Sequence, residues 1–219
     1  MHPSRLARFA FATAAVFAFT TSALAGPPLI CHALEIGQAK TLPWIDFNYR
    51  NGNRGYDLKH LTTDTLGILN SGAPALVRME TLRRATIYAR QDPQVAKELI
   101  TKLQARAADG NNALATFDFG YLVEAYKQWM GPNEPNPARG LDGYALVTKA
   151  VRTRGGDAEM EFAAALITLS GPEAAHREHV QRATAGAKGD ALLAQNLAAS
   201  LGNQTMSALL AQRAKDAQK

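Results

Sequence analysis

Apolar residues recur at helical spacing through residues 73–219. Leu76 begins an apolar stripe with steps of three residues, and Arg78 and Arg84 fall on another side of the same helical wheel. This pattern predicts an amphipathic helix over 75–90. Residue types that favour helix N-caps precede the later stripes, at Asp92, Asn112, Asp157 and Asp190.

Proline and glycine break this pattern into segments. The longest break, loop 131–138, holds three prolines, which cannot lie inside a helix, so we expect the loop to divide the helical region. No run of strand-forming residues with alternating polarity follows residue 72. We therefore predict an all-α fold of about seven to eight helices, paired as antiparallel helical hairpins through short loops.

Residues 26–72 differ from the helical region in composition. They are rich in glycine, proline, asparagine and aromatic residues, which predicts an extended, largely irregular N-terminal arm and loop. One short helix is expected over 57–70. The apolar side chains between Leu29 and Trp44 are more than a free tail carries. We expect this arm to pack across the helices, with Cys31 facing inward.

Residues 1–25 have the layout of a secretory signal peptide. Arg5 and Arg8 give a basic start without an acid, an apolar run covers 9–19, and the small residues Ala-Leu-Ala end at Ala25. The apolar run is about half the ~20 residues that a spanning helix needs. We expect a Sec-type signal peptide that is cleaved after Ala25, and an exported mature chain without a stable membrane span.

The charge balance gives no support for a nucleic-acid partner, and the cysteine content excludes an intramolecular disulfide. The chain holds 24 Lys+Arg against 19 Asp+Glu, and two of the arginines belong to the predicted signal peptide. The remaining basic excess is too small to favour nucleic acid as a partner. A single cysteine, Cys31, excludes an intramolecular disulfide, so the exported domain must fold on core packing alone.

Two segments in the C-terminal third share a pattern. Both 156–158 and 189–191 read Gly-Asp-Ala, at an offset close to the ~34-residue period of tetratricopeptide repeats. Phe162 and Ala165 continue the first segment with the small and aromatic spacing of that repeat's second helix, whereas Gln195 replaces the aromatic residue in the second. The C-terminal third therefore resembles tetratricopeptide-like helical repeats, which implies stacked helical hairpins.

The arm itself carries a second resemblance. Pro-Pro-Leu-x-Cys-His, Ile-Gly-x-Ala-Lys and Leu-Pro-Trp follow one another within 27–44, directly after the predicted signal peptide. This segment resembles a group of exported bacterial proteins of unassigned function. The resemblance implies a periplasmic or secreted bacterial protein, and it implies no activity.

Two pairs of residues are candidate metal ligands. Cys31 and His32 offer a thiolate and an imidazole, which suit copper or zinc. Neighbours in an extended segment point to opposite sides, so the alternatives are an apolar anchor around Cys31 with His32 more exposed, or an intermolecular disulfide. His176 and His179 share a helix face and could reach one ion, or they could belong to a solvated polar surface.

Aromatic residues gather on one predicted helix. Phe117, Tyr121, Tyr126 and Trp129 lie on more than one side of it, which exceeds what a single core contact needs. We interpret them as a groove that receives the arm or a partner peptide, with ordinary core packing as the alternative.

These features favour a non-enzymatic exported protein that mediates protein or peptide interactions in the cell envelope. The sequence shows no nucleophile elbow, phosphate-binding glycine loop or dinucleotide fingerprint, and we assign no catalytic residue and no cofactor to this function. The alternative is a small metal- or thiol-handling protein that uses Cys31 and His32 with copper or zinc. A hydrolase or lyase with a dispersed active site is the third interpretation.

Overall fold

The computed structural model describes residues 27–45 and 52–201. The predicted signal peptide, and a last helix expected to open at Asn203 or Thr205, lie outside the described residues. Within the described ranges every regular element is a helix and no strand occurs. The predicted all-α fold is therefore confirmed.

The helices follow one another through short connections. In chain order they are α1 (Pro28–Cys31), η1 (Leu58–His60), α2 (Leu61–Asn70), α3 (Ala75–Ala89), α4 (Pro93–Ala107), α5 (Ala113–Trp129), α6 (Gly143–Thr153), α7 (Ala158–Ile167), α8 (Glu173–Gly186) and η2 (Ala187–Gly189). Residues 191–201 are helical as well.

The predicted N-cap residues open their helices. Each accepts a hydrogen bond from a main-chain N–H in the first turn, which satisfies a group that the helix itself cannot pair. The distances are 2.8 Å for Asp92, 3.0 Å for Asn112, 3.2 Å for Asp157 and 2.9 Å for Asp190. The helix starts predicted at these residues are therefore confirmed.

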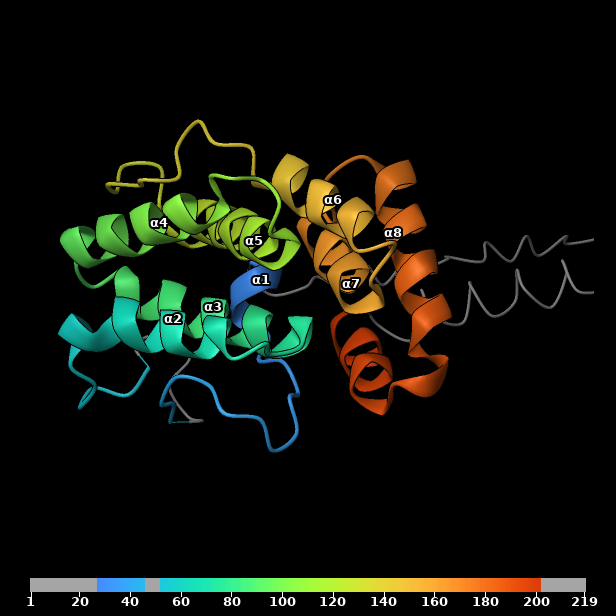
Figure 1. The fold of residues 1–219 in the computed structure, drawn as a ribbon, viewed down its shortest axis with the longest axis horizontal. Coiled ribbons are helices and arrows are strands. Elements are labelled where there is room, and N and C mark those ends of the chain that lie inside the picture. Colours follow the sequence, from blue (N-terminus) through green and yellow to red (C-terminus); the bar gives the residue numbers. More distant parts are fainter. Residues whose placement is uncertain (1–26, 46–51, 202–219) are drawn as a thin grey trace, which may run out of the picture.

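α3 and α5 form the centre of the molecule. Every residue of Ala75–Ala89 except Arg84 is buried, and so are residues 115–123 of α5. α2 and α4 pack against these two helices on one side, and α6, α7 and α8 continue the body on the other (Figure 1). Helices that are buried all round belong to the core of a layered helical domain.

α5 and α6 approach closely where two glycines meet. A Cβ atom on Gly120 would lie 2.7 Å from the carbonyl oxygen of Gly143, and a Cβ on Gly143 would clash with the carbonyl of Gly120. Only glycine permits this approach, because any other side chain would push the helices apart. The two helices flank loop 131–138, so the expected division at this loop is not a separation in space.

The helical body begins before residue 73. The helix expected over 57–70 is present as η1 and α2. Leu61 and Leu69 of α2 are at most 1% exposed and belong to the common core. The helix predicted within 26–72 is therefore part of the packed helical body rather than of a separate arm and loop.

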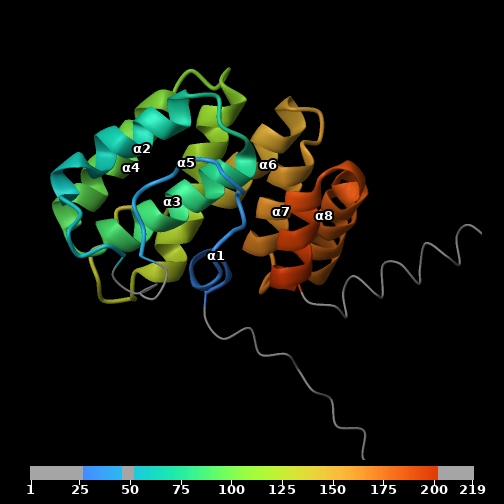
Figure 2. The same cartoon turned by 90° about the horizontal axis from the view of Figure 1, so that it is seen from below.

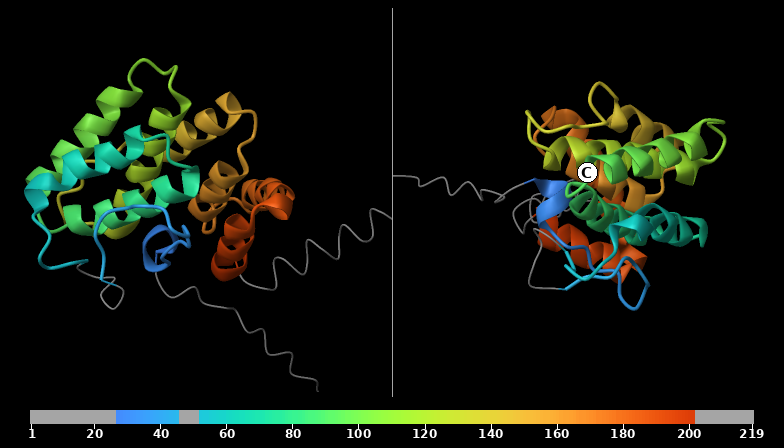
Figure 3. Two further views of the ribbon diagram at one scale, coloured as in Figure 1. Left: turned by 60° about the horizontal axis from the view of Figure 1, so that its bottom comes forward. Right: turned by 90° about the vertical axis from the view of Figure 1, so that its left-hand side faces the viewer.

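Residues 27–45, here called the arm, cross α3 and pack against the helices as expected (Figure 2). The extended conformation expected at its start is corrected, because Pro28–Cys31 form the short helix α1, with proline at the first helical position. α1 contacts α3, α5 and α7, and it lies between the first group of helices and the last (Figure 3). Four apolar side chains of the arm are 6% exposed or less. They are Leu29, Ile30, Leu34 and Leu42.

Candidate functional site

The polar side of α3 lies beneath the arm. The sequence places Arg78 and Arg84 away from the apolar stripe, on a side that solvent normally covers. In the structure Arg78, Glu80 and Arg83 are at most 1% exposed. Buried charges need partners within the protein, and the arm supplies many of them.

Glu80 is the centre of a charge network on α3. Its carboxylate accepts hydrogen bonds from Nε of Arg83 and Nε of Arg84, both at 2.7 Å. It also accepts the main-chain N–H of Leu34 at 3.0 Å. Both arginines donate a further hydrogen bond to an arm carbonyl, at 3.0 and 2.7 Å. Those carbonyls belong to Ile30 and Leu42.

Two other helices also hold the arm by its main chain. Gln128 of α5 accepts the N–H of Leu29 at 2.9 Å. Asn196 accepts the N–H of Glu35 at 2.9 Å and donates to the carbonyl of the same residue at 2.8 Å. We call the surface that holds the arm the arm groove. Its polar side chains are Glu80, Arg83, Arg84, Gln128 and Asn196.

Trp44 fixes the last part of the arm on α3. The guanidinium carbons of Arg83 and Arg84 lie 5.0 and 5.6 Å from its ring centroid, within the range of cation–π attraction. Tyr88 meets this ring edge-on and donates from its hydroxyl to the carbonyl of Pro43 at 2.5 Å. Burial raises the pKa of the Tyr88 phenol, so the hydroxyl remains a donor at neutral pH.

Asp118 of α5 forms a second buried ion cluster. Its Oδ2 accepts from Nη1 of Arg78 at 2.7 Å and from Nη1 of Arg106 at 3.0 Å. Burial raises the pKa of this carboxyl, and the two guanidinium groups oppose the shift. Arg78 also donates to the carbonyls of Leu69 and Ala73. The cluster therefore joins α2, α3, α4 and α5.

Cys31 ends α1 and His32 follows it. Both residues are half-buried, so the structure does not set Cys31 inside and His32 outside as expected. Cys31 is a free thiol, and Nε2 of His32 is buried without a hydrogen-bond partner. Within residues 27–45 and 52–201, no group of three or more His, Cys, Asp and Glu side chains is placed to hold a metal ion.

His176 and His179 of α8 both contact groups of neighbouring helices. Nδ1 of His176 lies 3.0 Å from the carbonyl oxygen of Ala165. His179 bridges two side chains, with Nδ1 at 2.5 Å from Glu161 Oε2 and Nε2 at 2.9 Å from the Tyr144 hydroxyl. Both ring nitrogens of His179 are therefore engaged, and a metal ion would have to displace one of these hydrogen bonds.

Tyr144, His179 and Glu161 form a hydroxyl–imidazole–carboxylate chain. Its order is that of a hydrolase triad, in which the imidazole removes a proton from the hydroxyl. Here burial and then the carboxylates of Glu178 and Glu161 raise the pKa of the Tyr144 phenol. That shift opposes a phenolate nucleophile at neutral pH. The arrangement instead links α6, α7 and α8 by hydrogen bonds.

The aromatic residues expected to bind a partner are mostly core. Phe117, Tyr121 and Tyr126 are at most 1% exposed, and burial raises the pKa of both tyrosines. Trp129 is half-buried, with the Arg90 guanidinium 4.9 Å from its ring centroid. The three buried rings offer no open surface to a partner peptide in the folded chain. Their burial fits core packing, the stated alternative, and α5 is also one of the helices that α1 of the arm contacts.

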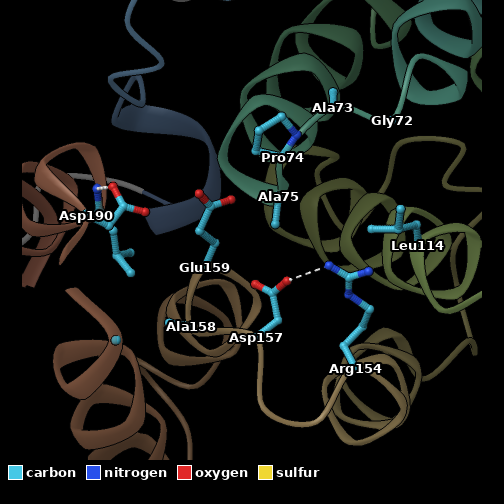
Figure 4. Close-up of a pocket in the computed structure, with 12 residues that line it drawn as sticks. Gly72, Ala73, Pro74, Ala75, Leu114, Arg154, Asp157, Ala158, Glu159 and Asp190 are labelled. Atoms are coloured by element: carbon cyan, nitrogen blue, oxygen red, sulfur yellow. Dashed lines mark hydrogen bonds and ion pairs between the residues drawn. The ribbon is translucent and has the colours of Figure 1, made fainter. Parts of the chain in front are cut away.

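An acidic hollow of about 390 Å³ lies where three helix starts meet. Figure 4 shows Asp157, Glu159 and Asp190 around it, with Arg154 paired to Asp157. Asp157 and Asp190 cap their own helices, and Glu159 accepts the N–H of Leu76 at 2.8 Å. Burial raises the pKa of the Glu159 carboxyl. Helix capping accounts for all three carboxylates.

Comparisons with protein-family models, curated proteins and solved structures found no match to this chain. Among residues 27–45 and 52–201 no helix is long and apolar enough to cross a membrane. Both resemblances drawn from the sequence stay predictions.

The side chains of the arm groove were not predicted as site residues. Glu80, Arg83 and Arg84 stand at helical positions i, i+3 and i+4, a spacing that is typical of a solvated helix face. Gln128 and Asn196 belong to no motif. The one signal in the sequence is the arm, whose excess of apolar residues needs a surface to cover it; nothing in the sequence indicates that this surface includes the charged side of 75–90.

Proposed function

We propose that this chain is a non-enzymatic, exported helical protein that mediates protein or peptide interactions in the cell envelope. The arm groove is the observation that supports this function. Its side chains bind main-chain N–H and C=O groups of the arm, both in the short helix α1 and in the irregular residues after it, at distances of 2.7–3.0 Å. Such contacts depend little on the sequence of the bound segment.

The composition of the scaffold supports the same proposal. Glu80 and Arg83 are buried, pair with each other, and each also hydrogen-bonds a main-chain group of the arm. The predicted signal peptide would deliver the chain to the envelope, where partners would be other exported proteins. The helical body holds the arm of its own chain on one surface, and its remaining outer faces are available to other proteins.

The test is co-purification from the envelope of the bacterium that produces the protein. The full chain is expressed with a C-terminal tag, crosslinked with an amine-reactive reagent and purified. We expect a defined partner in near-stoichiometric amount, absent when the same tag is carried by an unrelated exported protein. Recovery of this chain alone, with its crosslinks confined to itself, contradicts the proposal.

We also propose, as a second function, metal or thiol handling at Cys31 and His32. The supporting observation is the buried, unpartnered Nε2 of His32 beside a free, half-buried thiol. Thiolate and imidazole together suit copper or zinc, and a protein ligand set would need to be completed from outside the described residues or by solvent.

Metal titration of the mature chain tests this second function. We expect zinc or copper(I) to bind stoichiometrically, and Cys31→Ser or His32→Gln to weaken binding at least about tenfold. His60→Gln is the matched control, since the side chain of His60 is 67% exposed and belongs to η1. Metal binding that is equal in all variants, or absent from the wild type, contradicts the function.

A further inference from the structure

An open groove runs between α4 and loop 131–138, and Figure 1 shows this loop beside α4 and α5. Its volume is about 490 Å³, and a smaller hollow of about 130 Å³ shares its Pro93 and Pro135. We call it the α4–loop groove. The lining residues used below are Pro93, Lys97, Ile100, Thr101, Pro135 and Pro137.

The described lining of this groove combines five apolar residues, three of them prolines, with five polar ones. Ile100 is 4% exposed and belongs to the core cluster, so it forms a fixed apolar base. Pro93 and Pro135 are exposed beside it. Prolines carry no N–H donor, so these walls favour contact with a partner's side chains over main-chain pairing. In this respect the groove differs from the arm groove.

The loop wall is held in place before any partner binds. Glu134 accepts two hydrogen bonds from Arg90, at 2.6 and 3.0 Å. The Asn136 side chain donates to the carbonyl of Tyr126 at 3.3 Å and accepts the N–H of Ala138 at 2.9 Å. A wall fixed in this way adds little ordering cost to binding.

Lys97 gives the groove its charge. Among the described residues that line the groove it is the one ionisable side chain, and it is exposed. No ion pair joins it to any other residue in the part of the chain that the structure describes. The ammonium group is therefore available to a carboxylate from outside, next to an apolar base.

We propose that the α4–loop groove binds an extended segment of another protein in which an apolar side chain stands next to an acidic one. The apolar side chain covers Ile100 and the prolines, and the carboxylate pairs with Lys97. This inference rests on the proposed function and names its binding surface and its class of partner. Charge complementarity with Lys97 selects the acidic partner, and the exposed Pro93 and Pro135 supply most of the apolar contact, since Ile100 is 4% exposed.

The test uses the ¹⁵N-labelled mature chain and two synthetic peptides, acetyl-Ser-Asp-Leu-Asp-Ser-amide and acetyl-Ser-Lys-Leu-Lys-Ser-amide. We expect the acidic peptide to shift amide signals of α4 and loop 131–138, with a Kd at least about tenfold below that of the basic peptide. Lys97→Glu is expected to invert this preference. NMR detects the weak binding that so short a peptide provides.

A matched pair of variants separates blockage of the groove from a general effect on α4. Thr101→Trp places a large ring in the groove and is expected to abolish binding of the acidic peptide. Lys102→Trp places the same ring on a neighbouring exposed position that lines none of the hollows described here. This control is expected to bind the peptide as the wild type does.

Several outcomes overturn the inference. They are the absence of shifts in α4, equal binding of the two peptides, and unchanged binding by Thr101→Trp. A concentration-dependent dimer that Thr101→Trp dissociates would make a second copy the occupant and would overturn it as well. If an envelope partner is captured equally by wild type and Thr101→Trp, this inference fails while the proposed function stands. If no partner is captured at all, the proposed function fails.

Discussion

Two buried carboxylates, Glu80 in α3 and Glu161 in α7, have similar exposure but different surroundings. Both side chains are at most 1% exposed. Glu80 pairs with two arginines, one of them fully covered, beneath the arm. Glu161 pairs with His179 and with Arg182, which is 54% exposed, and it lines a hollow of about 540 Å³. One site is closed and the other opens to solvent.

The two sites also differ in the sequence separation of the residues that they join. Glu80 accepts the N–H of Leu34, 46 residues away in sequence, and the adjoining contact of Glu35 with Asn196 spans 161 residues. Glu161 meets His179, 18 residues away on the next helix. Loss of the first site should therefore weaken the whole molecule, and loss of the second should act on one hairpin.

The largest effect is expected for Glu80→Gln. The amide cannot balance two guanidinium groups, and Arg83, 1% exposed, would remain buried without its counter-charge. Breaking a buried ion pair in this way costs about 3–5 kcal/mol. We expect the free energy of unfolding, measured by urea denaturation, to fall by that amount, and limited proteolysis to cut the arm faster.

Glu98→Gln is the control for this substitution. Glu98 is exposed on α4 and forms no ion pair with another described residue, so its loss should change the free energy of unfolding by less than about 0.5 kcal/mol. If Glu80→Gln changes stability no more than Glu98→Gln does, the arm groove does not hold the chain together.

A smaller effect is expected for Glu161→Gln. A glutamine oxygen can still accept from Nδ1 of His179, and Tyr144 still binds the other ring nitrogen. We expect a loss of about 1–3 kcal/mol. Hydrogen exchange should accelerate in α8 and remain unchanged in the arm. Faster exchange in the arm, or a loss equal to that of Glu80→Gln, would remove the distinction between the two sites.

The sequence predicts the helices of this molecule better than it predicts the groups that bind. Caps such as Asp92 and Asn112 act within three residues, so local sequence is sufficient to find them. Arg83 and Asn196 act on the arm over 53 and 161 residues. Their role depends on which surface covers which, and a single helical wheel does not contain that information. The same limit placed Tyr121 and Tyr126 on a groove, whereas α5 is buried on nearly every side.

Glu159 extends the comparison to a half-buried carboxylate without a cation. It accepts the N–H of Leu76 at 2.8 Å and forms no ion pair with any residue of the described ranges. Burial raises its pKa from the usual 4.5, and the nearby Asp157 and Asp190 add to the shift. The smallest of the three effects is expected for Glu159→Gln, below about 1 kcal/mol, because solvent screens a half-exposed group.

The size of this effect depends on pH, and its sign favours the variant. Since the folded pKa of Glu159 lies above its unfolded value of about 4.5, the folded state holds the proton more tightly between those two values, and ionisation lowers stability as pH rises through that window. Glu159→Gln removes this loss. We therefore expect urea denaturation to show similar stability for variant and wild type near pH 4, and a variant advantage that grows toward pH 7 and then stays constant. A difference that does not change with pH would show that the N–H of Leu76 balances burial at this carboxylate, and one that favours the wild type increasingly at neutral pH would show that it outweighs burial. Either result contradicts the prediction.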